Sequence, residues 1–139
     1  MGRVTARVTV ENLEDIWALR KGKINSEQVR RIEVADALVD TGAVAFSLPT
    51  RLIKELGLVA IGVKNTITAN GPAKTTQYDA VRITIQDRSC TVDVLEVPDQ
   101  VPVLVGQIPL EFMDFIVDPV NRCLVGNPEH GGQQVLEVL

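Results

Sequence analysis

The sequence has no block of basic residues and no long hydrophobic run. Its 139 residues carry a formal net charge of −4, whereas a nucleic-acid-binding surface needs clustered Lys and Arg to neutralise phosphates. A membrane-spanning helix needs about 20 consecutive apolar residues, and no stretch of the chain offers them. The N-terminal MGRVTARVTV alternates charged and apolar side chains, unlike a signal peptide. We therefore expect a cytoplasmic protein that binds neither nucleic acid nor membrane.

Cysteine and histidine are scarce as well. Cys90 and Cys123 both lie in strand-like stretches, and without a secretion signal we expect them to be reduced and buried. The chain lacks the clustered ligands of a zinc site, so we expect no metal and no cofactor. A Cys–His protease would need the single histidine, His130, to pair with one of these cysteines. His130 lies in NPEHGG, which is typical of a solvated surface loop, so this interpretation is disfavoured.

Aromatic residues make up only 4% of the chain, so Val, Ile and Leu must form the core, and these residues favour strands. The alternation of apolar and polar residues predicts strands, and Asn70-Gly71 predicts a tight hairpin turn. Strands or hairpins are expected at 3–10, 29–39, 63–86, 90–97, 102–106 and 115–127, with a possible last strand at 131–139. Two short helices are expected at 49–56, capped by Ser47 and ended by Gly57, and at 108–115, while 11–23 reads as a helical turn or a loop. We predict one domain, residues 1–139, that is all-β with two short helices and forms a small closed β-barrel.

One acidic residue stands where the pattern predicts interior. In ADALVDTGAVAFSLP, residues 35–49, Asp40 ends an apolar run and Thr41 and Gly42 follow. Burying a carboxylate without partners costs several kcal/mol, but a turn at glycine can aim backbone amides at the acid. The later stretch PVLVG, residues 102–106, repeats the pattern of an apolar strand, a turn and a short helix, without the acid.

A single carboxylate is a poor hydrolase, whereas two that share one proton can activate a water between them. Two carboxylates about 3 Å apart cannot both ionise, so one acts as base and the other as acid. The chain has one such turn, around Asp40. A second copy related by a two-fold axis would therefore have to supply the other carboxylate.

These motifs resemble the retropepsin-like aspartic proteases. In that family an apolar strand leads into Asp-Thr-Gly, a flap hairpin follows, and a later apolar pair ends in glycine, as ALVDTGA, Asn70-Gly71 and PVLVG do here in order and spacing. The tail LVGQIPLEFMDFIVDPVNRCLVGNPEHGG is similar to the bacterial clan of small aspartyl proteases. The resemblance covers roughly residues 29–130. It implies the acid-protease barrel with one half-site per subunit, a homodimer and a polypeptide substrate.

The resemblance also implies roles for single residues. The catalytic residues would be Asp40, as acid and base, Thr41, interlocked with its symmetry mate, and Gly42, touching substrate and acid. Substrate-binding or loop-supporting positions would be Ala43, Ala69, Asn70, Gly71, Pro72, Val105 and Gly106, with Ala69 to Pro72 as the flap tip. Aliphatic pocket walls are expected from Val44, Ile67, Val103 and Val105. Gln107 stands where retroviral members carry an arginine that braces the dimer, so the dimer needs another brace.

Each motif also has a plain structural interpretation. Asp-Thr-Gly by itself occurs by chance and can be a strand-ending turn in which Asp40 accepts local amides. Asp114 and Asp118 are expected to be a helix-end charge and a turn former, and Trp17 a core or interface residue. The alternative function is a catalytically inactive dimerisation or peptide-binding module of the same fold, in which Asp40 serves only the geometry of the dimer.

Overall fold

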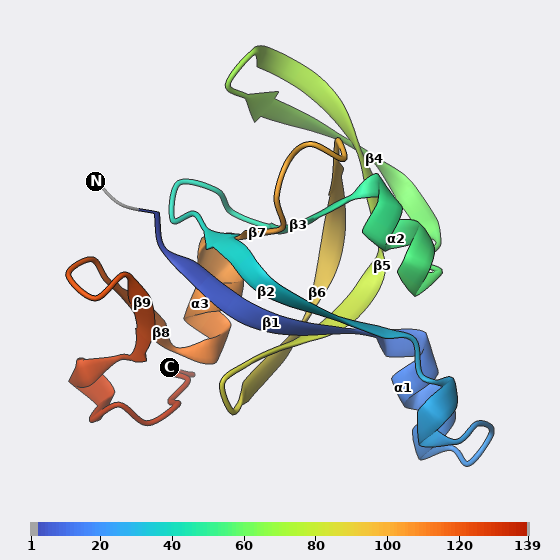
Figure 1. Ribbon diagram of the computed structural model, residues 1–139, viewed down its shortest axis with the longest axis horizontal. Coiled ribbons are helices and arrows are strands. Elements are labelled where there is room, and N and C mark those ends of the chain that lie inside the picture. The colour runs from blue at the N-terminus through green and yellow to red at the C-terminus, as the bar shows by residue number, and fades with distance from the viewer. Residues whose placement is uncertain (1–2, 139) are drawn as a thin grey trace.

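The computed structural model describes residues 3–138. Within them the chain forms nine strands, three α-helices and two short 3-10 turns (Figure 1). The strands are β1 Thr5–Asn12, β2 Arg31–Val39, β3 Phe46–Pro49, β4 Ala60–Thr68, β5 Gly71–Ile85, β6 Arg88–Val97, β7 Leu104–Val105, β8 Phe115–Asp118 and β9 Cys123–Gly126. The helices are α1 Leu13–Arg20, α2 Thr50–Leu56 and α3 Gln107–Met113, and the 3-10 turns are η1 Ser26–Gln28 and η2 Pro128–His130.

Six of the strands close into a barrel. Their order is β1-β2-β7-β3-β6-β5, and an antiparallel pairing of β1 with β5 completes the ring. Most pairings are antiparallel, but β2 pairs with β7 and β3 with β6 in parallel. β4 pairs with β5 and extends the sheet beyond the ring, and β8 and β9 form a separate two-stranded sheet. The predicted all-β barrel is therefore confirmed.

The core is aliphatic, as the composition predicts. Only Phe46 and Phe115 contribute aromatic rings to the main buried cluster. Strand positions that alternate inward supply most of the rest, and α2 and α3 each cover the barrel with two or three apolar side chains. The buried aliphatic residues of this cluster are Val8, Val10, Ile32, Ala37, Val39, Leu48, Ile53, Leu56, Val81, Ile83, Ile85, Val94, Val103, Val105, Leu110, Met113 and Leu124.

The start of α2 differs from the prediction. Ser47 does not cap the helix, because Phe46–Pro49 pairs with β6 and β7 as strand β3 and the Ser47 side chain is buried there. The helix begins at Thr50, and the Asp99 carboxylate, from a distant loop, accepts the Arg51 N–H at 2.8 Å. Gly57 does end the helix, in a left-handed conformation with φ 64°.

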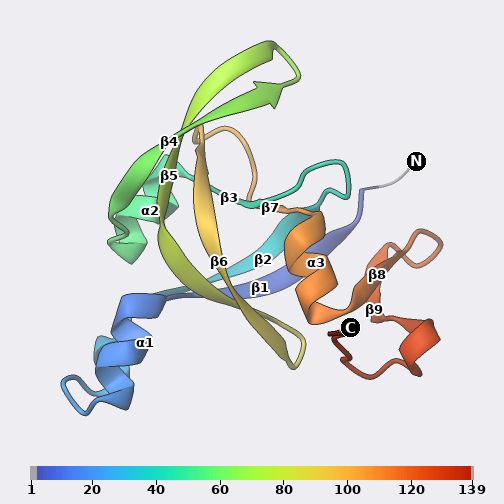
Figure 2. The ribbon, with the colours of Figure 1, turned by 180° about the vertical axis from the view of Figure 1, so that it is seen from behind.

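The N-terminal region holds a helix that the sequence left open. Residues 13–20 form α1, capped by the Asn12 side chain, and with η1 they project from one end of the barrel (Figures 1 and 2). Leu13 and Ile16 of α1 form a small second core with Val29. Trp17 is 51% exposed, so it is not a core residue.

The C-terminal region is only partly as predicted. The hairpin of β8 and β9 is confirmed, and the Asp118 carboxylate accepts the N–H groups of Val120 and Asn121 at its turn. The possible last strand is wrong for residues 131–138, which form no strand; Leu139 lies outside the described residues. Gly131 and Gly132 adopt positive φ, and the segment is held by side chains instead of by a neighbouring strand.

Candidate active site

Asp40 lies directly after β2, and its side chain is half-buried rather than fully interior. Its backbone N–H donates to the Val105 carbonyl at 3.0 Å, and its own carbonyl accepts the Ala43 N–H at 3.1 Å. Within residues 3–138, the one hydrogen bond to its carboxylate comes from the Gly42 N–H, 3.0 Å from Oδ1. The turn therefore aims an amide at the acid and leaves Oδ2 without a protein donor among these residues.

The two residues after Asp40 are exposed. A Cβ atom on Gly42 would lie 3.2 Å from Asp40 Oδ1, which is a crowded distance, so glycine lets the amide approach the carboxylate freely. Among the described residues, no side-chain hydrogen bond occupies the Thr41 hydroxyl, and this group stands beside the acid at the surface. The turn thus holds a half-buried carboxylate next to an exposed threonine.

The first turn of α3 holds the segment that follows Asp-Thr-Gly. The N–H groups of Gly106, Gln107 and Ile108 donate to the carbonyls of residues 45, 43 and 44 at 2.9, 2.8 and 3.0 Å. These are N–H groups that a helix start leaves without partners inside the helix. The active-site loop, residues 40–45, therefore satisfies the start of α3 and is positioned by it.

Glycine is required at position 106 because the active-site loop and the start of α3 lie very close together. A Cβ atom there would lie 2.4 Å from the Ala45 oxygen and 2.7 Å from the Ala43 oxygen, and both are backbone atoms. β2 and β7 run parallel, so that Asp40 and Gly106 follow neighbouring strand ends. The second copy of the sequence pattern, which lacks an acid, thus braces the first.

Two predicted roles need correction. Val103 and Val105 are buried in the core, and Val105 has no exposed surface, so they do not form pocket walls and Val105 does not reach substrate in this chain. Gly106 is also buried and supports the loop. Val44 and Ile67 are 63% and 89% exposed, and Ile67 lines an open surface hollow on the β4–β5 hairpin with Pro72.

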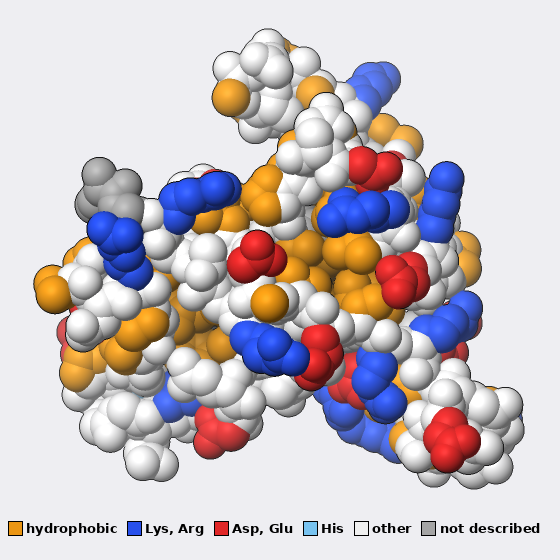
Figure 3. Space-filling view, in the orientation of Figure 1, with side chains coloured by type: hydrophobic (Ala, Val, Ile, Leu, Met, Phe, Trp, Pro, Cys, Tyr) orange, Lys and Arg blue, Asp and Glu red, His pale blue; other side chains and the backbone are white. Residues whose placement is uncertain are grey.

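The hairpin of β4 and β5 has the form expected of a flap. Thr68 pairs with Gly71 across a turn at Ala69 and Asn70, and Pro72 follows in β5. The Thr68 hydroxyl accepts the Asn70 N–H at 3.2 Å and donates to the Gly71 carbonyl at 3.0 Å. The hairpin projects from the barrel in Figures 1 and 2. Apolar side chains gather at the surface between it and the middle of the barrel in Figure 3.

His130 is not solvated as expected. Its Nδ1 lies 2.6 Å from an Asp114 carboxylate oxygen and its Nε2 lies 3.1 Å from Glu137. The Asp114 hydrogen bond, with that of Glu137, raises the pKa of His130. Both ring nitrogens are thus engaged by carboxylates, which argues against a Cys–His pair. Cys90 and Cys123 are free and half-buried, and burial raises the pKa of the Cys90 thiol to about 11.

Asp114 was expected to be only a helix-end charge, but it has a larger structural role. It is buried, takes a left-handed conformation at the end of α3, and accepts hydrogen bonds from His130, from Asn127 Nδ2 at 3.2 Å and from the Val135 N–H at 3.1 Å. Its position directly between an apolar helix and an apolar strand was a signal of burial. Its histidine partner, 16 residues later, could not be found from the sequence pattern.

The structure offers neither a metal site nor a membrane helix in the part of the chain that it describes. No group of three or more His, Cys, Asp or Glu side chains among residues 3–138 could hold a metal ion. Among the helices in that range, none combines the length and the apolar character needed to cross a bilayer.

Comparison with known proteins agrees with the geometry of this site. The profile of a family described as aspartyl protease matches residues 21–108, which is more than half of the chain. The matched range contains the active-site loop, the β4–β5 hairpin and the start of α3. No curated protein matches the chain.

Proposed function

Because this chain belongs to the aspartyl protease family, a family of the retropepsin-like clan, we propose that it is an aspartic endopeptidase that cuts extended polypeptides. The observation that carries the proposal is the turn at Asp40. It presents one carboxylate at the surface, with one oxygen held by the Gly42 amide, and α3 braces the loop. One such turn per chain is half of a two-carboxylate site, so the active form is a homodimer.

The chemistry follows from two Asp40 carboxylates that share one proton. The ionised one takes a proton from a bound water as the oxygen attacks the peptide carbonyl carbon, and the protonated one gives its proton to the carbonyl oxygen. As the tetrahedral intermediate collapses, one of its hydroxyls returns its proton to the ionised carboxylate, which restores a carbonyl, the C–N bond breaks, and the departing nitrogen takes a proton from the other carboxylate. The dyad ends with the single proton with which it began.

The neighbours of Asp40 take supporting roles in this proposal. The exposed Thr41 hydroxyl contacts its counterpart in the second copy, and Gly42 and Ala43 border the substrate main chain. The flap tip, residues 69–72, covers an extended peptide that is held as an added strand. Exposed apolar side chains such as Val44 and Ile67 favour apolar residues beside the cut.

The dimer lacks the arginine brace of the retroviral members. Gln107 stands at that position, and its Nε2 donates to Glu111 Oε1 at 3.2 Å, one turn along the same helix. The contact stays within α3, so other surfaces must hold the two copies together.

The test is cleavage of a denatured polypeptide by the purified protein, with and without a pepstatin-type inhibitor. We expect inhibitor-sensitive cleavage that Asp40→Asn lowers by about 10²–10⁴-fold. The matched control is Asp36→Asn, an exposed acid on β2 that leaves the loop unchanged. Activity should be highest at acid to mildly acid pH, because the dyad must hold one proton.

The outcomes separate the two functions. Cleavage by the wild type and by Asp36→Asn, but not by Asp40→Asn, supports the peptidase. Peptide binding without cleavage by both the wild type and Asp40→Asn would instead support the inactive dimerisation or peptide-binding module. A flat activity profile up to about pH 9 would contradict the shared proton.

A further inference from the structure

Helix α3 is held at both of its ends. Its first turn donates to the carbonyls of residues 43–45 in the active-site loop. Its last residue is followed by Asp114, whose carboxylate is hydrogen-bonded by the Asn127 and His130 side chains and the Val135 N–H of the C-terminal segment, residues 127–138. A helix of seven residues makes only two turns, so a change at one end is transmitted to the other end over a short distance.

The C-terminal end of α3 carries a charge of unfavourable sign. The last carbonyls of a helix are partially negative, so a carboxylate beside them is destabilising and a cation is stabilising. Asp114 places a carboxylate there, and it is buried. Its charge therefore needs nearby cations.

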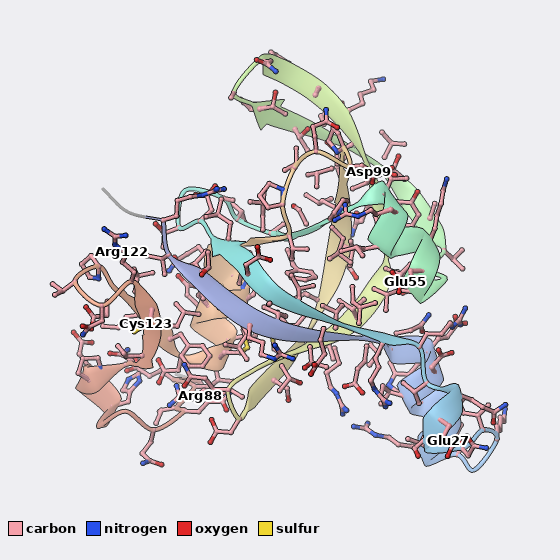
Figure 4. All side chains as sticks on the ribbon, in the orientation of Figure 1. Glu27, Glu55, Arg88, Asp99, Arg122 and Cys123 are labelled. Carbon is pink, nitrogen blue, oxygen red and sulfur yellow. The ribbon has the colours of Figure 1, made fainter. Side chains whose placement is uncertain are left out.

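Arg88 supplies one of these cations. It is buried, its Nη1 donates to the carbonyls of Met113 and Asp114 at 3.0 and 2.8 Å, and its Nη2 donates to the Gly132 carbonyl. Its guanidinium carbon lies 4.8 Å from the centre of the Phe115 ring. Figure 4 shows Arg88 beside the C-terminal segment. This cation caps the helix carbonyls, which leaves the Asp114 carboxylate to another partner.

His130 is that partner. Its ring faces Asp114 at the end of α3 and Glu137 in the C-terminal segment, with Arg88 of β6 beyond Asp114 and the exposed Glu129 next to it in η2. The protonated ring donates to both carboxylates, whereas the neutral ring can donate to only one. Hydrogen bonds that the ring donates to the carboxylates of Asp114 and Glu137 raise the pKa of His130, so the charged form persists above its usual range and is lost as the pH rises further.

We propose that His130 is a positioning residue for the active-site loop. In its protonated form it fixes Asp114, Asp114 fixes the end of α3, and the first turn of α3 holds the carbonyls of residues 43–45 beside Asp40. Loss of the proton removes the cation paired with the buried Asp114 carboxylate and leaves it only neutral donors such as Asn127 and the Val135 N–H, which loosens α3 and so loosens the loop. The effect on catalysis rests on the proposed function, but the coupling between His130 and the loop does not.

The experiment measures hydrogen exchange in the Asp40→Asn protein, which does not depend on activity. The amides of Gly106, Gln107 and Ile108 report the contact between α3 and the loop, and the imidazole resonances of His130 report its titration. Between about pH 5 and about pH 9, we expect the protection factors of these amides to fall by about fivefold or more as His130 loses its proton. The Leu58 amide, which donates at the end of α2, is the control and should not change.

A second comparison uses variants of the cluster. In His130→Gln the protection of the three amides should be low at all pH values, whereas Glu129→Gln should behave as the parent protein. Protection that stays constant while His130 titrates would overturn the proposal, and this result needs no variant. In the protein with Asp40 intact, His130→Gln should remove the fall in kcat that accompanies the titration of His130.

The two proposals fail in different ways. If the exchange follows His130 but the protein with Asp40 intact cleaves nothing, the positioning role stands and the peptidase does not. If the protein cleaves polypeptides but the hydrogen exchange of the three amides does not change as His130 titrates, the peptidase stands and the positioning role is wrong.

Discussion

Gly106 shows how one missing side chain decides the shape of the site. Its N–H donates to Ala45 while its Cα lies against the backbone of residues 43–45, so no side chain fits between them. Asp40 itself is only half-buried and is less tightly enclosed than Gly106. The active-site loop therefore depends most strictly on glycine at position 106, a residue that takes no part in the chemistry.

We expect Gly106→Ala to destabilise the protein by about 1–3 kcal/mol, because the added methyl overlaps backbone oxygens that cannot move independently. Chemical denaturation followed by circular dichroism measures the change. The control is Gly62→Ala on β4, where a Cβ atom would meet no heavy atom within 4 Å. Equal stabilities of the two variants would contradict the prediction, because they would show that the loop can shift to accommodate the added methyl group without lowering the free energy of unfolding.

At the scale of elements, the β4–β5 hairpin is an appendage of the barrel. β4 pairs with β5 alone, and residues 71–76 of β5 pair only with β4, so this outer part of the hairpin adds nothing to the closure of the ring. Gly71 at its turn has φ 104°, a conformation that other residues rarely adopt. The shape of the hairpin tip is therefore separable from the stability of the barrel.

We expect Gly71→Ala to raise KM or lower kcat while costing only about 1 kcal/mol of stability, because it strains the tip of the flap. Gly22→Ala is a matched control, since Gly22 also has positive φ with open space around it but lies after α1. Peptide cleavage and thermal unfolding are measured for both variants. If both leave cleavage unchanged, the hairpin does not act as a flap.

The C-terminal segment is an element held by polar contacts. Burial opposes the charge of Asp114, but hydrogen bonds from His130, Val135 and Asn127 outweigh it and lower the pKa of Asp114. The pKa of His130 is raised by the hydrogen bonds of Asp114 and Glu137. The Asp114 contribution to stability is present above the usual carboxyl pKa of about 4 and is lost as the pH falls below it. The His130 contribution is present below the usual imidazole pKa of about 6.5 and is lost as the pH rises through its raised value.

We therefore expect the stability difference between the wild type and His130→Gln to be largest between about pH 4 and about pH 6.5. It should shrink on both sides of that window. Urea unfolding at a series of pH values measures it, with Glu129→Gln as the control. A difference that keeps growing above the window would mean that neutral, not protonated, His130 stabilises the fold.

At the scale of the whole molecule, the proposed function gives one chain half of a catalytic site. The active-site loop bears a single acid, and the bracing repeat after β7 bears none. Activity should therefore depend on the association of two copies, and a heterodimer with one Asp40→Asn subunit should be inactive.

We expect that adding an equal amount of Asp40→Asn chain to the wild type lowers the activity to about half, because random exchange puts half of the wild-type chains into heterodimers. The assay is cleavage after the mixture has equilibrated, at a concentration where sedimentation shows dimers. Adding Asp36→Asn should instead raise the activity. Undiminished activity after mixing with Asp40→Asn would mean that each chain acts alone.

Local chemistry in the sequence was enough to predict much of this molecule. Aliphatic composition and period-two alternation predicted the strands and the aliphatic core, Asn70-Gly71 predicted the hairpin, and Asp40-Thr41-Gly42 predicted an acid in a turn. These features depend on residues next to one another in the chain, because turn conformation and side-chain alternation are local properties. Family membership is likewise carried by short motifs in order.

Tertiary structure alone decided the rest. Ser47 lies in β3 instead of capping α2 because distant strands pair with it, and Val105 is core because β7 is enclosed by its neighbours. The partnership of Asp114 and His130, and the brace of residues 43–45 by α3, join segments far apart in sequence. A sequence pattern reports what each residue prefers, whereas burial and long-range hydrogen bonds depend on which segments the closed barrel brings together.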